Sequence, residues 1–574
     1  MKLIIGEKPS VAQTIAKVLG VRGRKDGYIE GNGYVISWCI GHLVAPAPPE
    51  TYSEKYKHWD ISDLPIIPEA WQYQVLSTTS KQFNLLKRLM SRKDITEVIC
   101  ATDAGREGEL IFRLVYNEAK CKKPFKRLWI SSLEEQSIRD GFRSLHNGHD
   151  FDNLYYAALA RSKADWLIGM NATRLYSLKN YQTLNIGRVQ TPVLNMIVER
   201  EKEISDFTPQ TYYTVELNIG GFSAVSDRIN EKVDAESVAM SCDGAVSAII
   251  TDVVTDKKST APPKLYDLTT LQREANRIYG YTAKQTLDVA QSLYEKKLIT
   301  YPRTDSRYLT TDIQSAVPEL FRIASDTLNI TVDFTPDIKR VTDNEKVSDH
   351  HALIPTQTLG SADLSTISDE ERNVLLLICK RLITSLAEPY RYDTVKITVE
   401  CNGMDFHASG KTVTNIGWKQ SETDKAEIAD TAPTLPTLDN GSRFNNVSAQ
   451  IKEHKTTPPK LYTEDTLLSA MENAVKSDNA ERAGLGTPAT RAGVIEHLVT
   501  RGFAARNGKN IVPTDKGRHL ISHIPDSIKS ADMTAEWEAE LAKIANGKKT
   551  EAEFVCEVTN FVTALIETEC GANG

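Results

Sequence analysis

Two periods of apolar and polar residues run along the chain, one typical of helices and one of strands. Near the N-terminus an apolar run at residues 2–6 is followed by the polar stretch "EKPS" and then by apolar positions at helical spacing up to Gly20. This order predicts a strand, a loop and a helix that begins near Pro9. A second strand, loop and helix are predicted between residues 95 and 116, with the helix starting at Leu110. Both units are typical of an open α/β sheet, which places functional side chains at the carboxyl ends of its strands.

Farther along the chain the period changes. Residues 212–225 and 392–413 alternate strictly and are rich in β-branched side chains, which predicts strands of one discontinuous β-rich domain. The stretch between them, 262–388, is mainly helical and is predicted to be an insertion. Residues 151–210 have the pattern of amphipathic helices with a basic polar side. From spacing alone, that basic side fits an ordinary solvated surface equally well.

The chain also contains an internal repeat. "PPKLYDLTTLQREAN" from Pro262 recurs as "PPKLYTEDTLLSAMEN" from Pro458, and the segments that follow bring Thr282 into register with Thr487. We predict two related helical modules of winged-helix type, of which only the first carries Tyr301. Duplication alone can also serve simply to build a core.

Composition limits the classes of function. A chain of 574 residues divides into several domains, and 25% charged with 40% hydrophobic residues is ordinary for a soluble protein. No membrane span or signal peptide is expected, so we predict a cytoplasmic protein. The net charge of −7 argues against a general coat for nucleic acids, although residues 262–308 carry eight Lys/Arg against five Asp/Glu.

Two cofactors are not expected. The eight cysteines are scattered without a Cys-x-x-Cys pair, so neither a zinc ribbon nor a disulfide framework is predicted. The stretch "ASGKT" at 408–412 has Asp405 where the first glycine of an ATP-binding loop belongs, so ATP use is not predicted either.

The segment "LITYPRTDSRY", residues 298–308, has the residue types needed to attack a phosphodiester. Pro302 favours an extended backbone before it, which would place Tyr301 and Arg303 on the same side. A phenolate can act as the nucleophile, and a guanidinium can hold phosphate oxygens as charge builds on them. By itself such a pair is more often packed or on the surface, so support must come from other parts of the chain.

Carboxylates at two predicted strand ends supply that support. Asp103 and Glu107 lie where the second predicted strand meets its helix, and Glu7 follows the first strand. Carboxylate oxygens suit Mg²⁺, which takes one or two of them together with water and substrate phosphates. An acidic run at a helix start can also merely complement the helix dipole.

Six motifs in a fixed order give the chain a family resemblance. They are "GEKPS", "ATDAGREGELIF", "IGRVQTP" at 186–192, "LITYPRTDSRYL", "SDHHALIP" at 348–355 and "GLGTPATRAGVIE" at 484–496. Together they cover nearly the whole chain. The sequence resembles the type IA DNA topoisomerases, and the wording of the motifs is similar to the bacterial topoisomerase III branch.

The resemblance implies a multidomain α/β and α+β fold, in which a Toprim (Rossmann-like) domain, two winged-helix-like helical domains and a β-rich arch form a torus. The expected domains are 1–150 for the Toprim domain, 151–210 with 455–574 for the helical domain beside the single-strand groove, 211–261 with 389–454 for the arch, and 262–388 for the helical domain with the tyrosine.

The resemblance also implies an activity: Mg²⁺-dependent, ATP-independent cleavage of single-stranded DNA through a 5′-phosphotyrosine link, strand passage and religation, which relaxes negative supercoils and decatenates DNA. It implies catalytic roles for Tyr301, Arg303, Lys8, Glu7 and His350, and metal binding by Glu7, Asp103 and Glu107. It implies DNA contacts by Arg161, Arg174, Gly187, Arg188, Val189, Gln190, Thr191, Pro192, Thr487 and Arg491. Single-stranded DNA is the expected partner in the bacterial cytoplasm and nucleoid, with a helicase or single-strand-binding protein as a further candidate.

One departure from the family pattern keeps two alternatives open. The family's acidic motif is commonly Asp-x-Asp-x-Glu, whereas this chain has Gly105 at the middle position, so a second metal position is in doubt. A Toprim-type nuclease or primase would share the acidic loop without needing Tyr301. A non-catalytic scaffold would bind single strands without forming an adduct. His42, after another predicted strand, is interpreted as structural.

Overall fold

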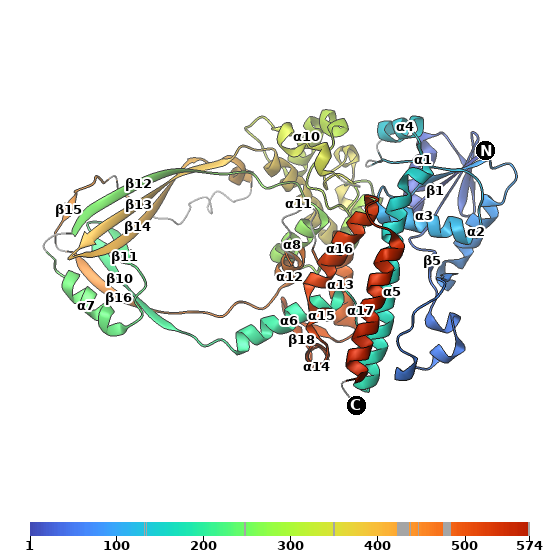
Figure 1. Ribbon diagram of the computed structural model, residues 1–574. Coiled ribbons are helices and arrows are strands. Elements are labelled where there is room, and N and C mark those ends of the chain that lie inside the picture. The colour runs from blue at the N-terminus through green and yellow to red at the C-terminus, as the bar shows by residue number, and fades with distance from the viewer. Residues whose placement is uncertain are drawn as a thin grey trace.

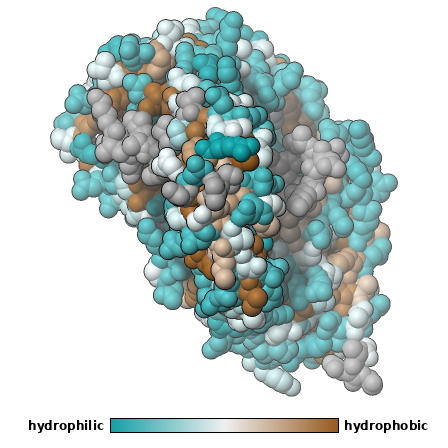
Figure 2. All heavy atoms as spheres, turned by 90° about the vertical axis from the view of Figure 1, so that its left-hand side faces the viewer, coloured by the Kyte–Doolittle hydropathy of each residue, from teal (hydrophilic) through white to brown (hydrophobic). Residues whose placement is uncertain are grey.

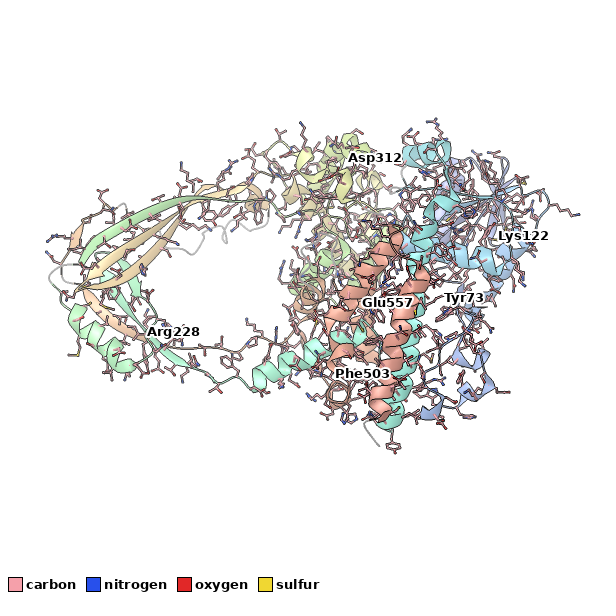
Figure 3. The ribbon with its side chains drawn as sticks, viewed as in Figure 1. Tyr73, Lys122, Arg228, Asp312, Phe503 and Glu557 are labelled. Atoms are coloured by element: carbon pink, nitrogen blue, oxygen red, sulfur yellow. The ribbon has the colours of Figure 1, made fainter. Side chains whose placement is uncertain are left out.

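The chain forms a ring. The computed structural model describes residues 1–574 except 131–132, 134, 246–247, 348–349, 422–434, 437, 446, 475–483 and 572–574. A bulky part that contains both termini is joined at two places to a long β arch, and the centre between them stays open in the ribbon and when side chains are drawn (Figures 1 and 3). The predicted torus of α/β, helical and β-rich parts is confirmed.

The N-terminal domain is built around a seven-stranded sheet in the order β2-β3-β4-β1-β7-β8-β9, in which β1 runs parallel to both of its neighbours. Alternate residues of β1 serve two cores: Leu3 and Ile5 pack with α2 and α3, whereas Ile4 packs with α1 and α4. The strands are β1 (Lys2–Gly6), β2 (Gly23–Lys25), β3 (Tyr28–Gly31), β4 (Tyr34–Trp38), β7 (Glu97–Ala101), β8 (Phe125–Arg127) and β9 (His146–Asn147). The helices are α1 (Pro9–Val18), α2 (Ser80–Met90), α3 (Arg106–Glu118) and α4 (Glu135–Arg143), and a small sheet pairs β5 (Val44–Pro46) with β6 (Tyr73–Val75).

The predicted start of α3 was wrong. The helix begins at Arg106 instead of Leu110, because Gly105 is extended and serves as its N-cap. Glu107 therefore belongs to the first turn of a helix and not to the preceding loop.

The helical body, residues 151–210 and 455–571, shares one hydrophobic core although its two segments are far apart in the sequence. Its longest helix, α5, lies against α16 and α17 (Figure 1). Its helices are α5 (Asp152–Lys179), α6 (Gln190–Ser205), α12 (Glu464–Glu472), α13 (Pro488–Thr500), α14 (Asp515–His523), α15 (Asp526–Lys529), α16 (Ala531–Ala545) and α17 (Glu551–Gly571), and its strands are β17 (Ala504–Asn507) and β18 (Asn510–Pro513).

The tyrosine domain, residues 262–388, has a separate core. Its helices are α8 (Leu268–Tyr279), α9 (Ala283–Glu295), α10 (Val317–Leu328) and α11 (Asp369–Ser385).

The arch is a sheet in the order β15-β12-β13-β14-β11-β10-β16, with α7 packed on it. β12 leads into the tyrosine domain and β13 leads out of it, so this domain is an insertion in the arch (Figure 1). The elements are β10 (Thr211–Ile219), β11 (Phe222–Ser226), α7 (Lys232–Cys242), β12 (Ala248–Thr260), β13 (Tyr390–Cys401), β14 (Met404–Asn415), β15 (Arg443–Phe444) and β16 (Ser448–Lys455).

The exposed face of the arch and the composition of the helices were compared with what contact with water or a membrane would require. Figure 2 shows that the face on the side of the arch is mostly hydrophilic, with hydrophobic residues scattered among the polar ones. Within the part of the chain that is described, no helix has the length and apolar character that crossing a bilayer would require.

Candidate active site

The carboxyl ends of two adjacent strands place the first group of site residues. β1 and β7 are paired so that Gly6 lies opposite Ala101, and the chain leaves these strands as Glu7-Lys8 and as Thr102-Asp103. The backbone N–H of Asp103 donates to Oε2 of Glu7 at 3.2 Å. The sheet thus brings together two carboxylates that are far apart in the sequence, as open α/β sheets do.

Tyr301 reaches this edge from the tyrosine domain. It follows α9 in a segment that runs beside residues 350–355, where the backbone N–H of Thr300 donates to the carbonyl of Ile354 at 3.0 Å. Thr304 Oγ1 donates to the carbonyl of His350 at 2.7 Å, so the rings of Tyr301 and His350 lie 4.3 Å apart. Ser348 and Asp349, which precede this histidine in its motif, lie outside the described residues.

Hydrogen bonds join the two domains at the phenol. Lys8 Nζ donates to the Tyr301 hydroxyl at 2.6 Å, and the charge of Asp103 acts on the same phenol. His350 Nε2 lies 3.8 Å from Oδ2 of the same carboxylate. Arg303 is exposed, and its charge acts on both Tyr301 and Lys8. The predicted catalytic residues therefore meet in one place.

Burial sets the protonation of the nucleophile and its partner. It raises the pKa of Tyr301 well above the ordinary value, and the charges of Asp103 and Glu7 add to this effect. Burial also lowers the pKa of Lys8, although the same two carboxylates oppose the change. The phenol of Tyr301 is thus held neutral beside Lys8.

The two carboxylates differ in their affinity for protons. Burial, followed by the nearby charge of Asp103, raises the pKa of Glu7 to about 7. Burial acts in the same direction on Asp103, but the nearby charges of His350 and Lys8 outweigh it, so the pKa of Asp103 is lowered. Glu7 can therefore exchange a proton near neutral pH, while Asp103 stays ionised.

The predicted set of three metal ligands is not assembled. Glu107 is engaged with His42, whose Nε2 lies 2.5 Å from Oε1 of Glu107, and this contact lowers the pKa of Glu107. Among the described residues no group of three acidic, histidine or cysteine side chains is placed to hold a metal ion. Glu7 and Asp103 do fit one Mg²⁺, because a cation would relieve the repulsion between two adjacent carboxylates and this ion needs no more than one or two of them.

A fully buried arginine supports the loop that carries Asp103. Arg127 donates to the carbonyl oxygens of Thr102 at 2.7 Å and of Asp103 at 2.5 Å, and its Nε lies 3.1 Å from Oε2 of Glu109. Gly108 passes so close that a Cβ there would lie 2.1 Å from the carbonyl oxygen of Asp103. The loop that carries Asp103 is thus held by Arg127, which the sequence analysis did not single out, and packs closely against Gly108.

Two of the predicted DNA-binding loops meet in the helical body. A Cβ on Gly486 would lie 3.4 Å from a methyl carbon of Val189, and Gln190 Oε1 lies 2.7 Å from His497 Nδ1 on α13. The backbone N–H of Gly187 donates to Thr191 Oγ1 at 3.1 Å, and Thr487 is the N-cap of α13. The loops "GRVQTP" and "GLGTP" therefore form one surface beside α6 and α13, with Pro192 inside the first turn of α6.

Some predicted DNA contacts have a packing role in the structure. Arg174, with 4% of its surface exposed, donates to the carbonyl of Tyr56 at 2.9 Å and lies over the ring of Trp59. Arg491 is also buried and donates to Thr269 Oγ1 of the tyrosine domain at 3.0 Å. We therefore leave Arg174 out of the proposed DNA-binding surface. Arg161 of α5 is half-buried and lies 3.7 Å from Glu538 of α16.

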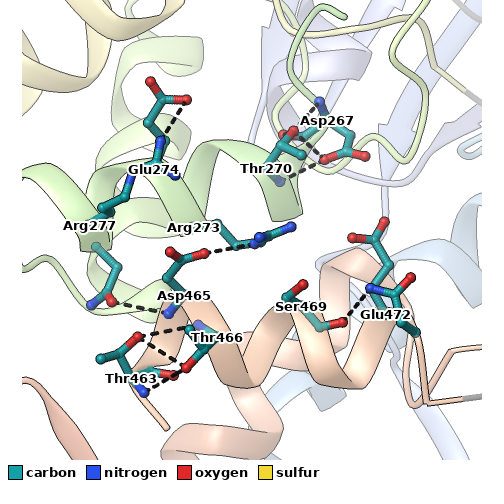
Figure 4. Close-up of polar contacts among 12 residues, drawn as sticks. Asp267, Thr270, Arg273, Glu274, Arg277, Thr463, Asp465, Thr466, Ser469 and Glu472 are labelled. Carbon is teal, nitrogen blue, oxygen red and sulfur yellow. Dashed lines mark hydrogen bonds and ion pairs between the residues drawn. The ribbon is translucent and has the colours of Figure 1, made fainter. Parts of the chain in front are cut away.

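Polar contacts also hold the tyrosine domain to the helical body. Arg273 of α8 lies 2.8 Å from Asp465 of α12, and Arg307 lies 3.0 Å from Glu472. In Figure 4 the two helices run side by side, with Arg273 and Asp465 between them. Each of these partly exposed ion pairs contributes about 1 kcal/mol or less to the contact between the two domains.

The sequence analysis missed several residues of the site. His42 had been interpreted as structural, although the structure places it on Glu107. Arg106, Asp165 and Glu538 form an ionic cluster with Arg161 and Arg188. Arg106 could have been found from the sequence, because it precedes Glu107 in the acidic motif. Glu538 belongs to no motif and could not.

Comparison with known proteins places the chain in a family. It belongs to the DNA topoisomerase family: the family model described as DNA topoisomerase matches residues 149–556, and the model of the Toprim domain matches residues 2–133. The resemblance drawn from the six motifs is confirmed.

Particular relatives narrow the branch. DNA topoisomerase 3 of Bacillus licheniformis is 40% identical over 98% of this chain and 81% of that protein, and DNA topoisomerase 3 of Bacillus subtilis is 39% identical with the same coverage. Full-length topoisomerase I of Thermotoga maritima has the same fold, with a TM-score of 0.73 at 22% identity over 98% of this chain and 90% of that one.

Proposed function

We propose that the protein cuts one DNA strand with Tyr301, lets another strand or duplex pass through the break, and reseals it, as a topoisomerase of the type III branch. The observation that supports this most directly is the hydrogen bond from Lys8 to Tyr301, which crosses the boundary between two domains. A nucleophile at a domain boundary can cut DNA and then move away with one end of it.

The chemistry follows from the positions of these groups. The Tyr301 oxygen bonds to phosphorus and releases its proton to water, while the bond from phosphorus to the 3′ oxygen breaks. Lys8 and Arg303 stabilise the charge on the phosphate oxygens. The leaving 3′ oxygen takes a proton, which Glu7, with a pKa of about 7, can supply while its carboxyl group is not bound to Mg²⁺. The reverse reaction restores the bond, so no ATP is required.

Mg²⁺ is the proposed cofactor, with Glu7 and Asp103 as its protein ligands. When bound, the ion would neutralise phosphate charge and hold the phosphate for attack. Gly105 supplies no carboxylate at the second position of the acidic motif, and we propose that a single ion suffices. We do not propose zinc as a cofactor.

The proposed substrate is single-stranded DNA, seated on the surface made by the "GRVQTP" and "GLGTP" loops and by Arg161. Basic and amide side chains with helix N-termini suit contact with phosphates without reading bases. We propose that the protein works in the bacterial cytoplasm at the nucleoid. A helicase or a single-strand-binding protein that exposes single strands would assist it.

The decisive experiment uses single-stranded DNA labelled at its 3′ end, since the 5′-phosphotyrosine link keeps that end. Protein, DNA and Mg²⁺ are mixed and quenched with denaturant, and labelled protein is measured. We expect an adduct in the parent, loss of it in Tyr301→Phe, and retention in Tyr294→Phe, whose ring lies 5.4 Å from that of Tyr301.

Two alternatives predict other results. Cleavage or primer synthesis that persists in Tyr301→Phe would favour a nuclease or primase. Binding of DNA without any adduct across a range of Mg²⁺ concentrations would favour a non-catalytic scaffold.

A further inference from the structure

An ionic cluster links four elements beside the DNA-binding surface. Glu538 of α16 is approached by three arginines from different elements: Arg106 of α3 at 3.5 Å, Arg161 of α5 at 3.7 Å and Arg188 before α6 at 3.0 Å. Asp165 of α5 lies 2.8 Å from the last of these. The cluster therefore contains more cations than carboxylates.

Three side chains of the cluster are partly exposed, and the cluster lies near Glu107 of the acidic motif. The side chains of Arg106, Arg161 and Glu538 are 34%, 22% and 19% exposed. The charges of the first two arginines also act on Glu107, which follows Arg106 in the chain. An anion that entered the cluster would thus lie close to the acidic motif.

One of the three arginines, Arg188, has a donor nitrogen that is free to bind an anion. Arg188 is 2% exposed at its side chain, yet its Nη2 has no hydrogen-bond partner among the described residues. Buried donors are nearly always paired, so an orphan guanidinium nitrogen indicates a missing acceptor. Phosphate oxygens bind guanidinium groups with the same geometry as carboxylate oxygens do.

An ion pair that merely joins α5 to a neighbouring helix is available for comparison, between Lys163 and Glu551. Lys163 of α5 and Glu551 of α17 are 2.8 Å apart, one cation to one carboxylate, and Glu551 is 19% exposed, like Glu538. Holding α5 to a neighbouring helix therefore needs one cation for one carboxylate, whereas the cluster has three arginines for the two carboxylates of Glu538 and Asp165.

We propose that Glu538 competes with the DNA backbone for these arginines. In the DNA-free protein the Glu538 carboxylate holds their guanidinium groups, and in the complex a phosphate of the bound strand takes its place. The inference rests on the proposed function, because it assumes a single strand in this groove. Its consequence is weaker resting affinity and faster release of the strand.

The competitor also changes how salt affects binding. Arginines that already hold a protein carboxylate carry fewer ions from solution, so DNA releases fewer ions when it binds them. Without the charge of Glu538, these arginines would hold solution anions and release them to the strand. Removing one negative charge should therefore strengthen binding and also steepen its salt dependence.

The test compares Glu538→Gln with Glu551→Gln, which makes the same change at the Lys163 pair. Binding of a fluorescent single-stranded oligonucleotide is measured by anisotropy without Mg²⁺ at several salt concentrations, and dissociation by stopped flow. We expect Glu538→Gln to bind about three- to tenfold more tightly at low salt, dissociate more slowly, and show a salt slope steeper by about one. Glu551→Gln should match the parent.

Other outcomes would overturn the inference. If Glu538→Gln binds as the parent does, or more weakly, with an unchanged slope, Glu538 merely organises the arginines. A thermal melt checks that Glu538→Gln is folded. If it is not, Glu538→Asp is measured instead, because aspartate keeps the charge but reaches less far toward the arginines. Unchanged or weaker DNA binding by Glu538→Asp would also reject competition. The adduct assay separates the two proposals, since an adduct at Tyr301 with unaltered affinity in Glu538→Gln would reject only this inference.

Discussion

Lys8 and Tyr301 show how strongly single positions depend on contacts that are remote in the chain. The lysine follows the first strand of the N-terminal domain and the tyrosine follows α9, yet they share a hydrogen bond of 2.6 Å. The motifs indicated both residues, because a phenol and cations are the groups that phosphodiester attack requires. Their protonation could not be predicted from the sequence, because it depends on how deeply both side chains are buried.

The histidine next to the site should control stability in acid. His351 is buried, and burial lowers its pKa to about 4 from an unfolded value of 6.5. Between these values the unfolded state binds more protons than the folded state, so stability falls as the pH drops from about 6.5 to about 4. The loss amounts to about 3 kcal/mol at most. We expect the difference between the urea midpoints at pH 7.5 and pH 5 to shrink in His351→Gln.

His58, which is exposed, provides the control for this measurement. His58→Gln should keep the parent's difference between the two pH values. A pH dependence that is the same in His351→Gln and in the parent would show that other groups control acid stability.

The close approach of Gly108 to Asp103 predicts a catalytic defect. In Gly108→Ala the new Cβ would meet backbone atoms of Asp103, which cannot move aside without shifting the carboxylate. A displacement of about 1 Å can cost up to about a hundredfold in rate, so we expect adduct formation to slow at least about tenfold. Gly169→Ala is the control, because its Cβ would meet the carbonyl oxygen of Ile186 at 3.8 Å. A normal rate in Gly108→Ala would mean that the loop tolerates displacement.

At the scale of elements, the internal repeat corresponds to two modules with the same local structure. α8 and α12 begin with capping boxes at repeat-related positions, Asp267 with Thr270 and Thr463 with Thr466. Each module then binds a strand in the same way: the N–H of Leu353 donates to the carbonyl of Tyr266, and that of Ile511 to the carbonyl of Tyr462. These shared features agree with the predicted pair of related helical modules.

The repeat also shows where prediction from sequence ends. The register that pairs Leu298 with Phe503 places Arg506 opposite Tyr301, and this arginine is held by Glu464 and Glu496. The second module has thus kept its shape without a nucleophile. Contacts between elements, such as those of Glu538, leave no periodic pattern in the sequence and could not be predicted.

The charged contacts between α8 and α12 should set how easily the tyrosine domain separates from the helical body. Arg273→Met and Asp465→Asn each remove one side of a partly exposed pair worth roughly 0.5–1 kcal/mol, so each should raise the open population about two- to fivefold. Distances between spin labels on α10 and α17 would measure it. Because the two changes remove the same contact, the double variant should open little more than either single one.

A matched change inside one domain is the control for the opening measurement. Arg518 and Glu201 form a pair at 2.7 Å within the helical body, and Glu201→Gln should not change the open population. Additive effects of Arg273→Met and Asp465→Asn would show that the pair does not hold the domains together.

At the scale of the whole molecule, we predict that DNA cleavage can be separated from strand passage by holding the ring closed. Ser137 of α4 donates to Asp312 of the tyrosine domain at 3.0 Å, at the upper junction in Figure 3. Cysteines at these two positions, joined by a short bis-maleimide after Cys556 and Cys570 are changed to serine, would keep the ring closed. We expect the adduct to form at the parent's level and relaxation of supercoiled DNA to fall at least about tenfold, because passage needs an open ring.

The single-cysteine variants treated with the same reagent are the controls, and both should relax DNA normally. Normal relaxation by the cross-linked protein would mean that the strand passes without separation at this junction.

The arch has a mechanical consequence in the cut state. In the proposed reaction one DNA end is then bonded to the tyrosine domain and the other is held by the helical body. The polypeptide joins these parts covalently through the arch alone. Any tension on the broken strand therefore passes along the arch. Among the described residues the register of β11 and β14 joins just two residue pairs, Val225 with His407 and Ser226 with Phe406, whereas β12 and β13 pair along most of their length. Under load the sheet would part first between β11 and β14, so the arch would lengthen there while the unbroken peptide chain keeps both DNA ends attached.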